Sequence, residues 1–167
     1  MITFITGGAR SGKSSFAQRE AEKLTDSPIY IATARIWDDD FRERVDRHIA
    51  ERDQNWTTFE KEKGLKELPL TGRVAVIDCV TLWLTNLFMD TDKDIDKSLK
   101  IFCKEIDELY AMDCRLFIIS NEIGMGTHAH NESARKFTDL QGWANQYVAN
   151  KADNVIFMIS GLPMVVK

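Results

Sequence analysis

The sequence predicts an α/β domain whose mainly parallel sheet is doubly wound, with helices on both faces. Short apolar runs alternate along the chain with longer stretches of helical periodicity. The apolar runs are continuous rather than alternating, as is typical of strands that are covered on both faces. The chain has 167 residues, of which 44% are hydrophobic, enough for one domain with a substantial core. We therefore expect residues 1–167 to form a single domain.

The elements follow from these patterns in chain order. Strands are predicted at residues 2–6, 29–34, 74–80, 116–120 and 155–160. Helices are predicted at residues 13–24, about 39–52, 95–112 and about 132–151. The polar stretch 55–72 holds two glycines and a proline, so we expect an irregular connection there.

The loop after the first strand has the sequence of a phosphate-binding P-loop. Residues 7–14, GGARSGKS, fit the pattern G-x-x-x-x-G-K-[ST] between an apolar run and a helical pattern. The glycines permit a tight turn whose N–H groups face phosphate oxygens, and the positive end of the next helix points at the same anion. The fold is therefore P-loop NTPase-like, and the ligand is a nucleoside triphosphate. The predicted nucleotide contacts in the loop are Gly7, Gly8, Ala9, Arg10, Ser11, Gly12, Lys13 and Ser14.

Two side chains are expected to work with a metal ion at this loop. The pattern assigns Lys13 to the β- and γ-phosphates and the Ser14 hydroxyl to Mg²⁺. Asp78 closes an apolar strand, as does the carboxylate that holds Mg²⁺ in many P-loop proteins. The alternative for Asp78 is the N-cap of a following helix.

The charge balance and the remaining motifs exclude several functions. A net charge of −4 with scattered lysines and arginines argues against nucleic-acid binding. NKAD at residues 150–153 resembles the guanine-reading motif of switch GTPases, but it follows a predicted helix and lies at the wrong edge of the sheet. Three cysteines without metal-ligand spacing indicate free thiols in a reducing compartment. The sequence shows no signal peptide and no run long enough to span a membrane, so we expect a cytoplasmic protein.

One predicted helix presents a basic face. Arg44, His48 and Arg52 share this face at a spacing of four residues. Flanking cations lower the pKa of a histidine and favour a neutral, nucleophilic imidazole. From spacing alone, an ordinary solvated helix face is the stronger interpretation. His128 and His130 lie in a glycine-flanked loop, where metal binding is the weaker interpretation.

Longer stretches resemble one enzyme family over essentially the whole chain. The segments are GGARSGKS at 7–14, YIATARIWDDDFRERVDRH at 30–48, IDCVTLWLTNL at 77–87, SNEIGMG at 120–126 and ARKFTDLQGWANQYVANKADNVIFMISG at 134–161. They are similar to the bifunctional adenosylcobinamide kinase/adenosylcobinamide-phosphate guanylyltransferases, which assemble the nucleotide loop of cobalamin.

The resemblance implies roles for individual residues. It places the family's covalent nucleophile on His48; where some members have a second histidine, this chain has Arg47. Some relatives have Glu at position 78. The resemblance further implies GTP contacts at the P-loop and at Ala32, Thr33, Ala34, Ile49, Ala50, Glu51, Arg52, Glu60 and Asp78.

The resemblance also implies two activities. The first moves the γ-phosphate of ATP or GTP to the aminopropanol hydroxyl of adenosylcobinamide. The second forms a guanylyl-histidine from GTP and passes GMP to adenosylcobinamide phosphate. The implied cofactors are GTP, ATP and Mg²⁺, and the implied assembly is a homotrimer. Two alternatives remain from the residues: a small-metabolite kinase without a covalent intermediate, and a nucleotide switch without transfer activity.

Overall fold

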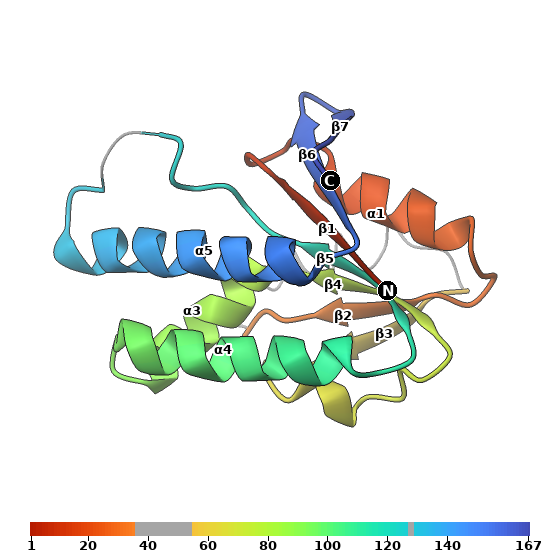
Figure 1. The fold of residues 1–167 in the computed structure, drawn as a ribbon, viewed down its shortest axis with the longest axis horizontal. Coiled ribbons are helices and arrows are strands. Elements are labelled where there is room, and N and C mark those ends of the chain that lie inside the picture. Colours follow the sequence, from red (N-terminus) through yellow and green to blue (C-terminus); the bar gives the residue numbers. More distant parts are fainter. Residues whose placement is uncertain (36–54, 127–128) are drawn as a thin grey trace.

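One sheet organises the molecule (Figure 1). The computed structural model describes residues 1–35, 55–126 and 129–167. Within these residues seven strands lie in the order β3-β2-β4-β5-β1-β6-β7, and every neighbouring pair is parallel except β6 and β7. The strands are β1 (Ile2–Gly7), β2 (Ile29–Ala32), β3 (Thr57–Glu60), β4 (Val74–Asp78), β5 (Arg115–Ile119), β6 (Asn154–Ile159) and β7 (Leu162–Val165).

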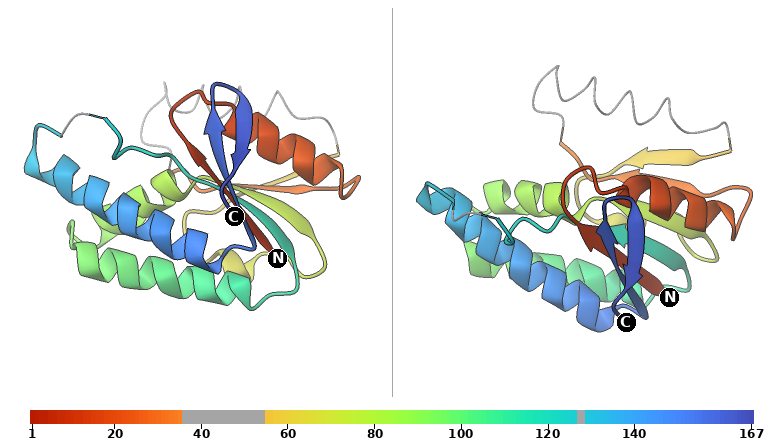
Figure 2. Two further views of the ribbon diagram at one scale, coloured as in Figure 1. Left: turned by 45° about the horizontal axis from the view of Figure 1, so that its top comes forward. Right: turned by 90° about the horizontal axis from the view of Figure 1, so that it is seen from above.

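Helices cover both faces of this sheet, as predicted. Three of them lie together on one face, and α1 lies on the other (Figure 2). A short 3₁₀ helix, η1, packs beside α4. The described helices are α1 (Lys13–Glu22), η1 (Leu65–Glu67), α3 (Val80–Asp90), α4 (Ile95–Tyr110) and α5 (Glu132–Lys151).

Side chains that alternate in direction along the strands contribute to two hydrophobic cores, one on each face of the sheet. Phe4 packs with Trp83 and Phe102 beneath α3 and α4, whereas its neighbour Ile5 packs with Ala17 on α1. Successive side chains of a strand point to opposite faces, so a run that is apolar at every position serves both cores. This is the physical reason why the continuous apolar runs predict buried parallel strands.

Several elements differ from the sequence-based expectation. The strand expected over residues 29–34 ends at Ala32, and helix α3 was not predicted. The strand expected over residues 74–80 ends at Asp78, and helix α3 begins at Val80. Residues 55–72 are not simply an irregular connection, because they contain β3 and η1. Strand β7 was not expected either. The edge strands β3 and β7 are short and largely exposed, so they lack the continuous apolar signal of the inner strands. The helix predicted at about 39–52 lies outside the described residues.

The NKAD motif occupies the edge of the sheet opposite the P-loop, as predicted. Helix α5 ends at Lys151, and Asp153 Oδ2 accepts a hydrogen bond of 2.7 Å from the backbone N–H of Ile2, at the start of β1. This aspartate therefore anchors the amino end of a strand. Within the described part of the chain, no helix is both long and apolar enough to cross a membrane.

Two tryptophans provide a test of the larger core. Trp83 is fully buried and meets Phe102 edge-to-face, with 5.1 Å between ring centroids, whereas Trp143 is 47% exposed. We expect Trp83→Ala to lower the free energy of unfolding by about 3–5 kcal/mol, because it leaves a cavity. The control Trp143→Ala should change it by about 0.5 kcal/mol or less. Urea denaturation followed by circular dichroism measures both; equal losses would contradict the assigned core.

Candidate active site

The P-loop runs from the end of β1 to the start of α1 and requires glycine at two positions. Gly7 has φ 148° and Gly12 has φ 90°, both in the region that favours glycine. A Cβ atom on Gly7 would lie 2.5 Å from the carbonyl oxygen of Met158, and one on Gly12 would lie 3.3 Å from the Cα of Gly161. The loop is therefore pressed against the end of β6, and larger residues do not fit at these positions.

Lys13 lies across the inside of this loop. Its side chain is buried, and Nζ donates to the carbonyl oxygens of Gly7, at 3.0 Å, and Gly8. Burial lowers the pKa of the Lys13 ammonium from its ordinary value, and the negative charge of Asp78 opposes that shift. A cation here, at the amino end of α1, attracts an anion to the loop.

The Asp78 carboxylate joins the loop to the middle of the sheet. Its Oδ2 accepts hydrogen bonds of 2.7 Å from the Ser14 hydroxyl on α1 and the Tyr30 hydroxyl on β2. The N-cap residue of α3 is Cys79, so the N-cap interpretation of Asp78 is wrong. The carboxylate and the Ser14 hydroxyl are oxygen ligands of the kind that Mg²⁺ prefers.

These groups open into one cavity at the carboxyl ends of the strands. Its volume is about 420 Å³. In open α/β sheets this edge is where ligands bind. A larger hollow of about 510 Å³, lined by Met1, Arg73 and Asp113, lies where β1, β4 and β5 begin, at the opposite edge, away from the P-loop. The smaller cavity is the candidate site. It is lined by Arg10, Ser11, Gly12, Lys13, Ser14, Ser15, Asp78, Ile119 and Asn121.

Two predicted contacts outside the P-loop share a row with Asp78. Ala32 is in register with Asp78 on one side and with Glu60 on the other. All three residues thus stand at the carboxyl edge, next to one another across β4, β2 and β3. Ala34 follows β2 and is half-buried. Nucleotide contacts from Ala32, Ala34 and Glu60 stay predictions.

Thr33 has a structural role that the sequence did not indicate. It is fully buried; its Oγ1 donates to the carbonyl of Cys79 at 2.7 Å and accepts from the N–H of Cys79 at 2.9 Å. The Thr33 carbonyl accepts from Asn86 Nδ2 on α3 at 2.7 Å. Thr33 therefore fixes the chain directly after Asp78, and a nucleotide contact from it stays a prediction.

Several predicted site residues belong to segments that the structure does not describe. His48, the contacts Ile49, Ala50, Glu51 and Arg52, and also Arg44, lie outside the described residues. So does His128, whereas His130 is exposed. In the described ranges, no group of three or more His, Cys, Asp or Glu side chains is placed to hold a metal ion.

Sequence reasoning missed Tyr30 as part of the site. The rule that ligands bind beyond the carboxyl ends of parallel strands points to Thr81 and Asn121, but it gave neither residue a role. Asn121 lies two residues after β5, at the edge of the sheet where the P-loop lies, and this position was the available signal, whereas Tyr30 lies within β2 and reaches Asp78 only through its hydroxyl. Their contacts join segments far apart in the chain, which no local pattern reveals.

Burial and the neighbouring Asp78 raise the pKa of the Cys79 thiol to about 12, so this cysteine stays protonated and is not a nucleophile.

Comparison with known proteins agrees with these features. A family model described as cobinamide kinase / cobinamide phosphate guanyltransferase matches residues 3–166. The chain belongs to this family. The CobP protein of Pseudomonas aeruginosa, named a bifunctional adenosylcobalamin biosynthesis protein, is 36% identical over 100% of this chain and 98% of its own length. The CobU proteins of Escherichia coli and Salmonella typhimurium, which carry the same description, are 35% and 33% identical over the full length of both partners.

A solved structure is less similar. The flagellar accessory protein FlaH of Methanocaldococcus jannaschii is 14% identical, with a TM-score of 0.49 over 99% of this chain and 77% of that chain. This likeness is too low to bear on the fold or the activity of this member of the cobinamide kinase / guanyltransferase family.

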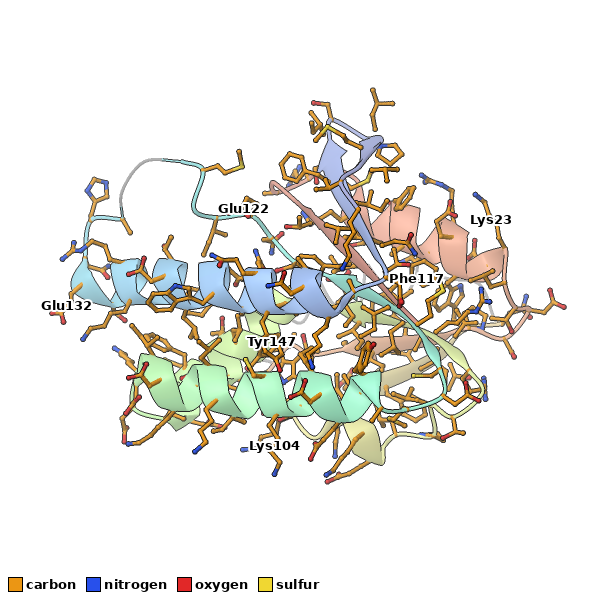
Figure 3. The ribbon with its side chains drawn as sticks, viewed as in Figure 1. Lys23, Lys104, Phe117, Glu122, Glu132 and Tyr147 are labelled. Atoms are coloured by element: carbon orange, nitrogen blue, oxygen red, sulfur yellow. The ribbon has the colours of Figure 1, made fainter. Side chains whose placement is uncertain are left out.

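Tyr30 offers a test of the link to Asp78 in this family member. Tyr30 is 4% exposed, so Tyr30→Phe removes a buried hydrogen bond to a carboxylate. We expect the free energy of unfolding to fall by about 1–2 kcal/mol. Tyr147→Phe is the control, because the Tyr147 hydroxyl bonds Asp107 at the surface between α5 and α4 (Figure 3), and it should cost about 0.5 kcal/mol or less. Urea denaturation of both variants measures the two losses. Equal denaturation midpoints for Tyr30→Phe and Tyr147→Phe would rule out a stabilising hydrogen bond between Tyr30 and Asp78.

Proposed function

We propose that this chain, as one domain over residues 1–167, phosphorylates adenosylcobinamide and then transfers GMP to the product. The observation that carries the proposal is a coincidence of two findings. The family match spans residues 3–166, and the cavity of the same chain gathers Lys13, Ser14 and Asp78 around a P-loop. The family description names both activities, kinase and guanyltransferase.

The kinase step needs positioning and charge neutralisation more than covalent chemistry. The P-loop N–H groups and the amino end of α1 hold the phosphates of ATP or GTP, and Lys13 reaches the β- and γ-phosphates. The aminopropanol hydroxyl of adenosylcobinamide attacks the γ-phosphorus. The bond to the bridging oxygen breaks, and the nucleoside diphosphate leaves.

The residues fit Mg²⁺ as the metal of this step. The Ser14 hydroxyl and the Asp78 carboxylate already lie within 2.7 Å of each other at the phosphate site. Mg²⁺ is commonly bound by one or two protein oxygens together with substrate phosphates, so a larger cluster of acidic residues is not needed. When bound, the ion neutralises charge on the phosphates. Ser14 and Asp78 are the residues that would hold it.

The guanylyl step needs a nucleophile, for which we propose His48. The imidazole nitrogen attacks the α-phosphorus of GTP, pyrophosphate leaves, and a guanylyl-histidine forms. An oxygen of the corrinoid phosphate then displaces His48 and gives adenosylcobinamide-GDP. Imidazole is nucleophilic near neutral pH without strong tuning. We assign Ile49, Ala50, Glu51, Arg52, Glu60, Ala32, Thr33 and Ala34 to the GTP contacts, as the family resemblance implies.

A labelling experiment tests the covalent step. The protein is incubated with Mg²⁺ and GTP labelled at the α- or the γ-phosphate, and denaturing gels are run for the unaltered chain, His48→Ala and His130→Ala. We expect an acid-labile label from the α-phosphate only. It should be absent in His48→Ala and unchanged in His130→Ala, because His130 is exposed in a loop.

The same gels separate this proposal from the kinase without an intermediate. A folded protein that binds GTP but takes no α-label would remove the covalent step and leave that kinase. No observation on the described residues favours it. A label that persists in His48→Ala would assign the nucleophile to another residue.

The assembly of the protein and its cellular compartment are also proposals. The family resemblance implies a homotrimer, and the edge strand β7 supports an interface, because Leu162, Met164 and Val165 are 72%, 48% and 73% exposed. The three cysteines carry free thiols, which supports a reducing compartment such as the cytoplasm.

Sedimentation equilibrium tests the assembly. We expect a mass three times the 19.1 kDa of one chain, and a shift toward one chain in Val165→Asp, because a charge at the edge of β7 opposes burial there. The control Ile101→Asp changes a half-exposed apolar residue of α4, far from β7 in Figure 1, and should leave the mass unchanged. A single-chain mass for the unaltered protein would refute the trimer. A lower mass of the assembly in both variants would refute β7 as the interface.

A further inference from the structure

The order of the strands places one more residue between the two halves of the phosphate site. Strand β5 lies between β1, which leads into the P-loop, and β4, which ends at Asp78. Ile119 is in register with Ile5 on one side and with Asp78 on the other. Asn121 follows two residues later and lines the same cavity as Lys13 and Ser14.

The side chain of Asn121 is held in a fixed orientation. Its Nδ2 donates to the hydroxyl of Thr81, in the first turn of α3, at 3.1 Å, and its backbone N–H approaches the same hydroxyl at 3.3 Å. Nδ2 also lies 4.0 Å from Cys79 Sγ, a weak acceptor. Among the described residues no donor reaches Oδ1 of Asn121, so this carbonyl oxygen is the part of the amide left for a ligand.

A buried polar cluster supports Asn121 from behind. Ser120, Gln141 and Asn145 are 0%, 1% and 7% exposed. The Ser120 hydroxyl donates to Asn145 Oδ1 at 2.6 Å, and Gln141 Nε2 donates to the Ser120 hydroxyl at 2.8 Å. Asn145 Nδ2 then donates to the carbonyl of Asn121 at 3.2 Å. Buried amides are costly unless they are bonded. Apart from Gln141 Oε1, which has no partner among the described residues, the polar side-chain atoms of this set are bonded, and these bonds fix the end of β5 to α5.

The backbone on both sides of Asn121 is tied to the P-loop strand. The N–H of Ser120 donates to the carbonyl of Ile5 at 2.9 Å, and the N–H of Glu122 donates to that of Gly7 at 3.0 Å. Glu122, labelled in Figure 3, lies in the loop that leads from β5 toward α5. Asn121 therefore keeps its position relative to the phosphate-binding loop.

We propose that Asn121 is a catalytic residue of the kinase step and orients the attacking alcohol. A carbonyl oxygen only accepts hydrogen bonds, so Oδ1 has no favourable contact with deprotonated phosphate oxygens, which Lys13 and the loop N–H groups serve. Its partner in the cavity is a hydrogen-bond donor or a cation, and the hydroxyl of the phosphoryl acceptor is such a donor. Asn121 takes no proton: the oxygen–phosphorus bond forms, the nucleoside diphosphate leaves, and the proton of the alcohol passes to a phosphate oxygen or to water.

The inference rests on the proposed function and separates its two steps. In the kinase step the attacking atom carries a hydrogen that Oδ1 accepts. In the guanylyl step the attacking atoms are an imidazole nitrogen and a phosphate oxygen, and neither carries a hydrogen. The contact from Asn121 therefore assists γ-phosphoryl transfer and leaves the formation of guanylyl-histidine untouched.

The test compares Asn121→Ala with Thr81→Val, which frees the amide but keeps its acceptor, and with the control Asn150→Ala at the exposed end of α5. Each protein is assayed for single-turnover γ-phosphate transfer to cobinamide, for α-label incorporation and for GTP affinity. We expect kinase rates about 100-fold lower in Asn121→Ala, about 10-fold lower in Thr81→Val and unchanged in Asn150→Ala. The α-label rate and the GTP dissociation constant should stay within about threefold of the unaltered protein.

Two results would overturn the proposal. A kinase rate in Asn121→Ala within about threefold of the unaltered protein would show that the amide does not act in the transfer. Equal losses of kinase rate, α-label and GTP affinity would show that Asn121 supports the nucleotide site as a whole. If Asn121→Ala does not fold, Thr81→Val carries the same comparison.

A second readout does not depend on the corrinoid. Slow transfer of the γ-phosphate to water also uses an attacking O–H, so Asn121→Ala should slow basal GTP hydrolysis by about 10-fold or more, with GTP affinity retained. Unaltered protein that hydrolyses GTP but does not phosphorylate cobinamide would refute the proposed function. The hydrolysis rates would still decide on Asn121, because unchanged hydrolysis in the variant overturns its role.

Discussion

The Asp78 carboxylate is the contact that unites the site with the fold. One oxygen accepts from Ser14 on the helix after the P-loop and from Tyr30 on the neighbouring strand. A half-buried carboxylate is costly unless charge-assisted hydrogen bonds satisfy it, and this pair of hydroxyls does so. The P-loop helix, β2 and β4 are thereby fixed to one another at the edge of the sheet where the P-loop lies.

The P-loop is constrained from its other side by β6 and β7. Gly7 packs against the backbone of Met158, and the carbonyl of Ser11 accepts from the N–H of Gly161 in the turn between the two strands. A loop that presents its N–H groups to an anion cannot use them for its own structure, so it depends on such external contacts. This explains why the antiparallel hairpin at the end of the chain matters for the phosphate site.

Burial acts on the site in two opposite ways. It lowers the pKa of the Lys13 ammonium and raises that of the Cys79 thiol, in each case by disfavouring the charged form. The neighbouring Asp78 favours the charge of the lysine and disfavours that of the thiolate. The same carboxylate thus favours the charged form of Lys13 and the protonated form of Cys79.

The sequence by itself determined the elements with a local cause. The P-loop is read from eight consecutive residues, the inner strands from continuous apolar runs, and α5 from helical periodicity. The family resemblance follows from the same local segments. Asp78 was found because a carboxylate directly after an apolar strand is conspicuous.

Only the tertiary structure decided what depends on neighbours. The apolar sequence of α3 continues that of β4 almost without interruption, so no periodicity separates them, and the strand's end is set by Asp78 and its partners. The hydrogen bond between Tyr30 and Asp78 joins residues 48 positions apart. The hydrogen bond between Asn121 and Thr81 spans 40 positions, and the one between Ser120 and Asn145 spans 25. Such pairs meet because the sheet and the helices packed on it bring distant segments of the chain together. A local sequence pattern does not reveal contacts between residues so far apart in the chain.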